Sequence, residues 1–309
     1  MKGQPKNVAA SIRQKLFNLA VKTKEDFGLM LTRYALERLL FRLSRSSHSN
    51  EFVLKGAMLF RVWANDPHRP TRDLDLLGQG EPSPERCVDA FREICQVGVP
   101  DDGIIFVPET VVAERIKEDQ EYEGVRVTLM SRLENARIPI QVDIGFGDAV
   151  VPSPTVLDYP TLLLGQPAPR LRVYPMSVVV AEKLEAIFQL GMLNSRMKDF
   201  FDIWFLANTF PFESNVLAQA MRATFERRGT ELNAEKFKSL LVELDSDSKK
   251  HQQWSAFINK SGVASAPEFS AAVQIIERFM GAPVLAAQNK PATGERWEPG
   301  GGWKESGTS

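Results

Sequence analysis

The sequence has few of the residues that form disulfides and zinc sites, with two cysteines and three histidines among 309 residues. So few cysteines exclude a disulfide scaffold, and we interpret Cys87 and Cys95 as reduced thiols. His48, His68 and His251 are scattered, without the spacing of metal ligands. The patterns GxSxG, Walker A and GxGxxG are also missing, which argues against the enzyme classes that depend on them.

Long hydrophobic segments are missing as well. We find no apolar run near the roughly 20 residues that a membrane-spanning helix needs. The first residues, MKGQPKNVAASIRQKLFNLA, are charged throughout and contain no secretory apolar core. Apolar residues make up 43% and charged residues 25%, which excludes a disordered chain. We therefore expect a globular cytoplasmic protein without a membrane partner.

Charge of one sign is not in excess overall, because 38 basic residues face 39 acidic ones and the net charge is −1. The charges are unevenly placed, however. Residues 1–48 contain ten basic and three acidic residues, so this segment carries +7 and the remaining chain −8. A basic segment on an acidic body favours a phosphate-bearing partner. The alternative is a solvated helical surface.

Four segments differ in pattern, and together they predict an α+β fold. Residues 1–48 show the periodicity of two helices. Residues 49–175 predict a mixed sheet, with a helix at 84–97, a Pro-rich connector at 150–169 and strands at 73–78, 104–107, 125–130 and 138–144. Residues 176–280 predict a helical domain, with helices at 177–192, 197–209, 214–227, 233–245, 248–259 and 267–280. Residues 281–309 are rich in Gly and Pro, with two Trp, and predict a mobile or partner-bound tail.

Asp73 and Asp75 are the sharpest chemical feature, at the start of the predicted strand DLDLLG. Residues i and i+2 of a strand project from one face, so the two carboxylates lie side by side. A cation between them relieves their repulsion, and oxygen ligands suit Mg²⁺. The alternative is an exposed strand with an acidic face.

Asp143 lies in a second predicted strand, RIPIQVDIGFGD, where a carboxylate among apolar residues is unusual. On a strand adjacent to DLDLLG it would complete a set of three carboxylates able to hold two metal ions. The alternative is an ion pair with a basic neighbour such as Arg137.

Candidates for phosphate binding lie upstream of the carboxylates. Lys55 and Gly56 stand at the expected start of a helix, where a glycine lets backbone N–H groups approach a phosphate. Thr71 precedes Asp73 by two residues, and its hydroxyl could donate to a phosphate oxygen.

Further candidates lie in the helical region. Lys183 and Arg196 or Lys198 could neutralise a triphosphate, while Asp199 and Asp202 are neighbours on one helix face. The alternative is a salt bridge between Lys183 and one of these aspartates that packs two helices together.

Seven motifs follow one another along the chain: SIRQKLFNLA, YALERLLFRLSRS, FVLKGAMLF, RPTRDLDLLG, IQVDIGFGD, AEKLEAIFQLGMLNSRMKDFFDIW and WEPGGGW. This ordered set resembles the AbiEii/AbiGii toxin family, also called MenT-like nucleotidyltransferases. The resemblance implies a nucleotidyltransferase fold of the polymerase-β type with a helical C-terminal domain. It also implies the toxin of a bacterial toxin–antitoxin pair, which adds nucleotides from an NTP to the 3′ end of tRNA and so blocks aminoacylation and translation.

The resemblance also implies roles for the strand residues. Asp73 and Asp75 stand at the metal-binding pair of the family, and Thr71 stands at the Ser or Thr before that pair. Asp143 stands where a third acidic strand residue is expected. Ala57 is a departure, since the family often has Gly-Gly after the Lys.

In the helical region, Lys183 stands at the Lys of the E-K-L motif and Asp199 at the Asp of the K-D motif. The resemblance implies that Lys183 and Thr71 hold the triphosphate, while Asp199 orients Lys183. Mg²⁺ is then the cofactor, and an NTP is the substrate, with CTP and GTP as candidates. The implied partners are tRNA and a cognate antitoxin, for which a winged-helix regulator is the candidate.

Three other functions remain open from the sequence. The same fold could transfer a nucleotide to a protein. The chain could be a non-catalytic nucleotide- or RNA-binding module, although the complete acidic set counts against that. A DNA-binding regulator using the basic N-terminal helices ranks last, because no clear recognition helix stands out.

Overall fold

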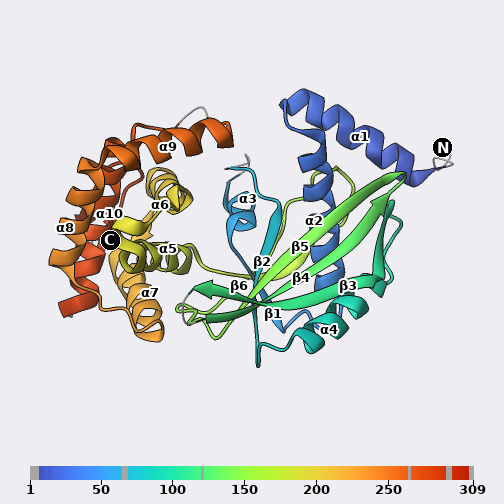
Figure 1. The fold of residues 1–309 in the computed structure, drawn as a ribbon, viewed down its shortest axis with the longest axis horizontal. Helices are drawn as coiled ribbons and strands as arrows, with labels where there is room; N and C mark the ends of the chain where they lie inside the picture. The colour runs from blue at the N-terminus through green and yellow to red at the C-terminus, as the bar shows by residue number, and fades with distance from the viewer. Residues whose placement is uncertain (1–6, 65–68, 120–121, 264–265, 290–293, 306–309) are drawn as a thin grey trace. The chain divides into compact units, whose positions relative to one another are not determined.

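A mixed sheet and a helical assembly form two separate units of the chain. The computed structural model describes residues 7–64, 69–119, 122–263, 266–289 and 294–305 (Figure 1). Unit 1 comprises Met1–Gly147 and Thr155–Val173, and unit 2 comprises Asp148–Pro154 and Tyr174–Ser309. Lys2 and Lys6 of the basic N-terminal segment, and His68, lie outside the described residues.

Unit 1 contains a seven-stranded sheet in the order β3-β4-β5-β2-β1-β7-β6. Its strands are β1 (Phe52–Lys55), β2 (Asp73–Gly78), β3 (Ile104–Asp119), β4 (Tyr122–Leu133), β5 (Ala136–Phe146), β6 (Thr155–Asp158) and β7 (Arg170–Val173). The pairs β2–β5 and β1–β7 are parallel, and the other neighbouring pairs are antiparallel. The sheet is therefore mixed, as predicted.

Helices cover one face of this sheet, and the aspartates of β2 and β5 lie on the other face. The helices of unit 1 are α1 (Val8–Thr23), α2 (Phe27–Arg45), α3 (Phe60–Trp63), α4 (Pro84–Gln96) and the short 3₁₀ helix η1 (Ala57–Leu59). Both α2 and α4 pack on the sheet and on each other. Leu74, Leu76, Val142 and Ile144 are buried on strands β2 and β5. Because side chains alternate along a strand, the aspartates between them project from the opposite face.

Unit 2 is built from helices and a small antiparallel sheet. The helices are α5 (Met176–Leu190), α6 (Met197–Thr209), α7 (Ser214–Arg227), α8 (Ala234–Ser246), α9 (Ser248–Ser261), α10 (Phe269–Asn289) and the 3₁₀ helix η2 (Gly191–Leu193). The strands β8 (Phe212–Glu213), β9 (Glu295–Trp297) and β10 (Trp303–Glu305) form the sheet in the order β10-β9-β8. The predicted helices of this region are found, most within two residues of their expected limits.

Helix α10 extends further than its predicted end at residue 280. It continues through Pro283 to Asn289, because it packs against α6, α7 and α8. The stretch Phe269–Gln288 is long and apolar enough to cross a membrane by composition, yet half of it is buried inside the unit. The expectation that no apolar run approaches this length is therefore wrong, and the packing of the run is that of a core helix.

Residues 294–305 of the tail, which was predicted to be mobile or partner-bound, form a hairpin against the helices of unit 2. Trp297 is fully buried, and its indole N–H donates to the carbonyl oxygen of Ala207 at 2.6 Å. Trp303 stacks on Phe279 with ring centroids 6.0 Å apart. The glycines between the two Trp allow the turn that joins β9 to β10, so the hairpin closes over the helices.

The α+β class is confirmed, and in unit 1 the strands differ from those predicted. Strands β3, β4 and β5 exceed their predicted limits, because the sheet extends through residues with charged side chains. Strands β6 and β7 were not predicted, since they lie in and beside the Pro-rich connector. Each has only four residues. They pair with each other along their whole length, and β7 joins the sheet through Val173, which pairs with Leu54 of β1.

Candidate functional site

Three aspartates lie in register on neighbouring strands of unit 1. Asp73 and Asp75 occupy one face of β2, and Asp75 is the direct partner of Asp143 on the parallel strand β5. Directly paired residues point to the same face of a sheet. The structure therefore brings these three predicted residues together, on the face that α2 and α4 do not cover.

Asp143 has a basic partner that was not predicted from the sequence. Arg126, its antiparallel neighbour on β4, places Nε and Nη2 at 2.8 Å from the two carboxylate oxygens. The amide of Gln141 lies 3.3 and 3.2 Å from the same oxygens. The expected alternative partner, Arg137, pairs in register with Arg132 instead. The alternation around Arg126, in the sequence VRVT, is the signal that could have revealed it.

The three aspartates were expected to hold metal ions together. Among the residues that the structure describes, no three His, Cys, Asp or Glu side chains are grouped closely enough to do so. Asp73 and Asp75 fit a divalent cation by chemistry, because both are half-buried and offer hard oxygen donors on one face. Asp143 fits less well, since both of its oxygens accept hydrogen bonds from Arg126.

Lys55 and Gly56 lie beside the aspartates, but the expected helix is short. Lys55 ends β1 as the register partner of Asp75, and its side chain is buried. Gly56 precedes only η1 and the four residues of α3. Its backbone has φ 74° and ψ −159°, and a Cβ there would lie 1.9 Å from Oδ2 of Asp75. Glycine is required here mainly because β1 passes so close to Asp75.

Thr71 lies just before β2. Its hydroxyl is 3.3 Å from the carbonyl oxygen of Asp73 and donates to it. This hydrogen bond shapes the approach to the strand, and it places the hydroxyl near the backbone of the first aspartate.

Four predicted residues form an ion-pair cluster within unit 2. The ammonium group of Lys183 on α5 lies 2.9 Å from Oδ1 of Asp199 and 2.6 Å from Oδ2 of Asp202, both on α6. Arg196, at the start of α6, places Nε 2.8 Å from Oδ2 of Asp199. Both aspartates are fully buried, whereas Lys183 keeps 13% of its side chain exposed. The salt bridge weighed as the alternative is thus present, in the geometry that lets Asp199 orient Lys183.

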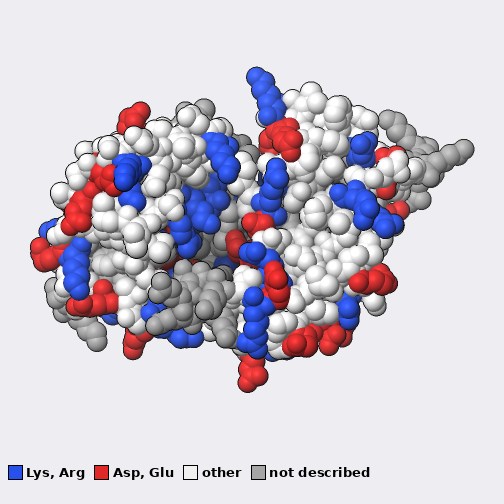
Figure 2. Space-filling view, viewed as in Figure 1, with Lys and Arg blue, Asp and Glu red and all other residues white. Residues whose placement is uncertain are grey.

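The basic N-terminal segment is less available to a partner than its charge suggests. Arg38 is fully buried against Glu37, and Arg42 is buried in a two-bond pair with Asp102 at 2.7 and 3.1 Å. These two arginines cannot contact nucleic acid, because they stabilise the core of unit 1. Among the residues of this segment that the structure describes, the exposed basic ones are Lys15, Lys22, Lys24 and Arg45. Figure 2 shows basic and acidic side chains interspersed on the face in view.

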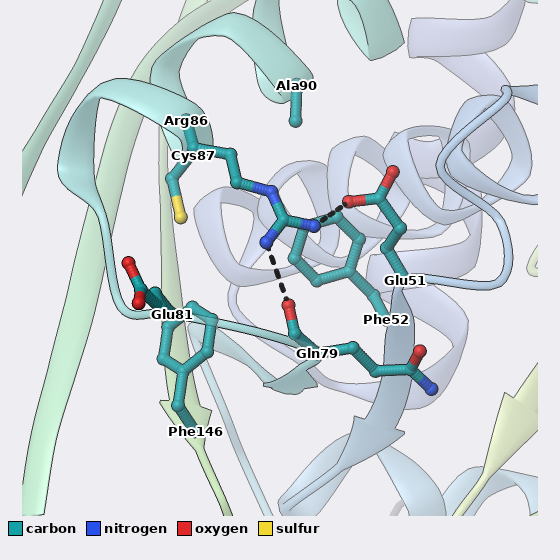
Figure 3. Close-up of a pocket in the computed structure, with 8 residues that line it drawn as sticks. All are labelled: Glu51, Phe52, Gln79, Glu81, Arg86, Cys87, Ala90 and Phe146. Carbon is teal, nitrogen blue, oxygen red and sulfur yellow. Dashed lines mark hydrogen bonds and ion pairs between the residues drawn. The ribbon is translucent and has the colours of Figure 1, made fainter.

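A small pocket lies where the chain enters β1 and leaves β2 (Figure 3). Arg86 spans it and donates to Glu51 at 2.6 Å and to the carbonyl oxygen of Gln79 at 3.1 Å. The cavity volume is about 10 Å³, which holds about one water molecule. The pocket is thus too small for a nucleotide, and its ion pairs attach α4 to the sheet.

His48 extends this network, with Nδ1 at 2.8 Å from Glu51 and Nε2 at 2.9 Å from Glu93. Burial alone would lower the pKa of His48, but the hydrogen bonds to Glu93 and Glu51 outweigh it and raise the pKa above 6.5. The imidazolium form is therefore favoured in the folded protein.

We expect the stabilising effect of His48 to depend on pH. Because its pKa is raised by folding, the contribution is complete below about pH 6.5 and is lost as the pH rises through the folded value. Its size is less than about 1 kcal/mol, since Glu93 is largely exposed. Urea unfolding of the wild type and His48→Gln between pH 5.5 and 8.5 tests this. Parallel curves for the two proteins would contradict it.

Comparison with known proteins gives one family. The family model described as "Nucleotidyl transferase AbiEii toxin, Type IV TA system" matches residues 38–275. The crystal structure of JHP933 from Helicobacter pylori is 15% identical, covers 82% of this chain and 89% of its own, and has a TM-score of 0.48. A second H. pylori structure, named as that of a nucleotidyltransferase, is 15% identical, covers 83% and 93%, and also has a TM-score of 0.48. No curated protein matches the chain.

The matched segment includes the three aspartates, Arg126 and the Lys183 cluster. It spans well over half of the chain. This protein therefore belongs to the AbiEii family of nucleotidyltransferase toxins of type IV toxin–antitoxin systems.

Proposed function

We propose that this toxin transfers a nucleotide from an NTP to the 3′ acceptor end of tRNA and thereby blocks aminoacylation. Membership of the AbiEii family supports nucleotidyl transfer and the existence of an antitoxin partner. The observation that carries the catalytic part is the pairing of Asp75 with Asp143, beside Asp73, on the uncovered face of the sheet. The tRNA target follows from the resemblance of the motifs.

Asp73 and Asp75 would hold a divalent cation, with Mg²⁺ as the natural candidate. A bound cation would neutralise phosphate charge and favour deprotonation of an attacking hydroxyl. Lys55, next to Asp75, limits the repulsion between the carboxylates. The protein's own contribution is mainly to position charges for in-line attack on the α-phosphate, with pyrophosphate as the leaving group.

Lys183 and Asp199 keep the roles that the resemblance implies, and Arg196 remains a candidate for triphosphate binding by its charge. Lys183 would bind the triphosphate, while the buried carboxylate of Asp199 fixes the position of its ammonium group. Thr71 would contribute its hydroxyl from the entry to β2. The antitoxin is proposed to be a winged-helix regulator, which a neighbouring gene of that type would support.

Incubation with total tRNA and each labelled NTP separately tests the function. We expect label at the tRNA 3′ end with one or two NTPs, and CTP and GTP are the candidates. Asp73→Asn should lower transfer by at least about 1,000-fold, because it removes a metal-binding charge without changing the volume of the side chain. Its melting temperature, measured beside that of the wild type, controls for folding.

Other outcomes select the competing functions. Label on protein and not on RNA would favour a protein target. NTP binding without label on any acceptor would favour a non-catalytic module. Undiminished transfer by folded Asp73→Asn would refute the assignment of this aspartate.

A further inference from the structure

Five charged residues cross neighbouring strands of unit 1 at one level of the sheet. The register pairs Lys55 with Asp75, Asp75 with Asp143, Asp143 with Arg126, and Arg126 with Glu114. Paired residues share a face, so the charges run positive, negative, negative, positive and negative across five strands. The two adjacent anions, Asp75 and Asp143, are thus flanked on each side by a cation of the protein itself.

The cation beside Asp143 is held in a fixed geometry. Nε and Nη2 of Arg126 each lie 2.8 Å from a different carboxylate oxygen. Two parallel charge-assisted bonds of this kind are strong and directional. To bind a metal ion, Asp143 would have to release these bonds and place a second cation next to the guanidinium group. Both changes oppose metal binding by Asp143.

Arg126 retains capacity to bind an anion. A guanidinium group has five N–H donors, of which Asp143 occupies two. The side chain is 35% exposed, whereas that of Asp143 is only 15% exposed. The hydrogen bonds that Arg126 donates to Asp143 raise the pKa of the guanidinium group despite burial, and the charges of Asp143, Asp73 and Glu114 raise it further. The group therefore stays charged, oriented and accessible on the same face as Asp73 and Asp75.

We propose that Arg126, oriented by Asp143, binds a phosphate oxygen of the nucleotide in place of a second metal ion. Asp143 is then a positioning residue and not a metal ligand, and one divalent cation binds to Asp73 and Asp75. This inference rests on the proposed function, because it assigns the charges that bind the triphosphate. It differs from the three-ligand site that the sequence pattern suggested.

Binding of Mn²⁺ alone, followed by electron paramagnetic resonance, tests the metal ligands. We expect one Mn²⁺ per wild-type chain and an affinity within about threefold of wild type for Asp143→Asn. Asp73→Asn and Asp75→Asn should each weaken binding by about tenfold or more, as expected for loss of a charged ligand. Thermal unfolding of each variant shows whether it is folded.

Binding of tripolyphosphate with saturating Mn²⁺, measured by calorimetry, tests the role of Arg126. Arg126→Met should weaken binding by about tenfold or more, since it removes a charge-assisted hydrogen bond. Asp143→Asn should weaken it in the same direction, because the guanidinium group loses its orientation. Arg126→Lys should fall between Met and wild type. Arg132→Met, an exposed arginine on the same strand, is the matched control and should bind as the wild type does.

The two measurements separate the possible failures. Loss of Mn²⁺ from folded Asp143→Asn, to the extent seen for Asp73→Asn, would overturn the inference and restore a metal-ligand role. Unchanged tripolyphosphate affinity in Arg126→Met would also overturn it. If Asp73→Asn and Asp75→Asn both kept Mn²⁺, the metal site of the proposed function would fail as well. None of these readouts requires knowledge of the acceptor.

Discussion

Replacing Gly56 by alanine is expected to reduce nucleotide transfer by at least about 100-fold, because the new methyl group displaces Asp75. The added Cβ would lie 1.9 Å from Oδ2 and 2.6 Å from Cβ of Asp75. Rotation of the Asp75 side chain moves the oxygen but not the Cβ atom. Relief of the clash therefore has to move the backbone of β1 or β2.

The backbone of Gly56 adds a second cost to this substitution. Its φ of 74° and ψ of −159° lie in a region that only glycine adopts readily, and an alanine there is strained by about 1–3 kcal/mol. Labelling of the acceptor measures the loss of activity, and urea unfolding measures the loss of stability. Gly98→Ala is the matched control, since its added Cβ meets nothing within 4 Å.

A double variant, Gly56→Ala with Asp75→Gly, identifies the cause of the lost stability. If the clash with Asp75 dominates, Asp75→Gly should restore part of the stability of Gly56→Ala without restoring transfer, because the two sites are coupled. Wild-type transfer by Gly56→Ala would show that the close approach of β1 to Asp75 does not matter for activity.

Replacing Lys183 by methionine is expected to destabilise the protein by about 3–5 kcal/mol. Asp199 and Asp202 are fully buried, and Lys183 lies within 2.9 Å of both. With Lys183 removed, two carboxylates remain in the interior with Arg196 as the nearby cation of the cluster. The cost arises from buried negative charge and not from lost packing, since methionine retains most of the side-chain volume.

Lys236→Met provides the control for this effect. Lys236 forms an ion pair with Glu231 at 2.6 Å, but both side chains are more than half exposed. Its removal should cost less than about 1 kcal/mol. In urea unfolding, Asp202→Asn should recover part of the stability lost in Lys183→Met. Equal losses for Lys183→Met and Lys236→Met would contradict a buried-charge effect.

The expected destabilisation of Lys183→Met affects how the activity of this variant is interpreted. Lys183 is both a proposed triphosphate ligand and a structural cation of unit 2. Inactivity of Lys183→Met indicates a catalytic role only if transfer is measured at a temperature where the variant is folded. Asp199→Asn needs the same precaution.

The parts of the site that the sequence predicted are those with local causes. A period of two along DLDLLG places Asp73 and Asp75 on one face whatever the rest of the sheet does. Helical spacing likewise places Asp199 and Asp202 on one side of α6. The helices of unit 2 were found for the same reason, because each carries its own apolar stripe.

The parts that the sequence did not predict depend on pairing between distant segments. Arg126 meets Asp143 because the β4–β5 register places them opposite each other, and their 17-residue separation gives no hint of this. Arg38 and Arg42 counted as basic surface in the sequence, yet their partners bury them in the interior.

The sequence by itself thus determined the α+β class, the two-carboxylate face of β2 and the composition of the helical region, because local periodicity encodes them. Only the tertiary structure decided which charges are already neutralised within the protein. Strand register pairs Asp143 with Arg126, and the packing of α5 on α6 pairs Lys183 with two aspartates. The β9–β10 hairpin holds the tail on the helices. Ion pairing depends on distances of a few ångströms, which the order of residues along the chain does not specify.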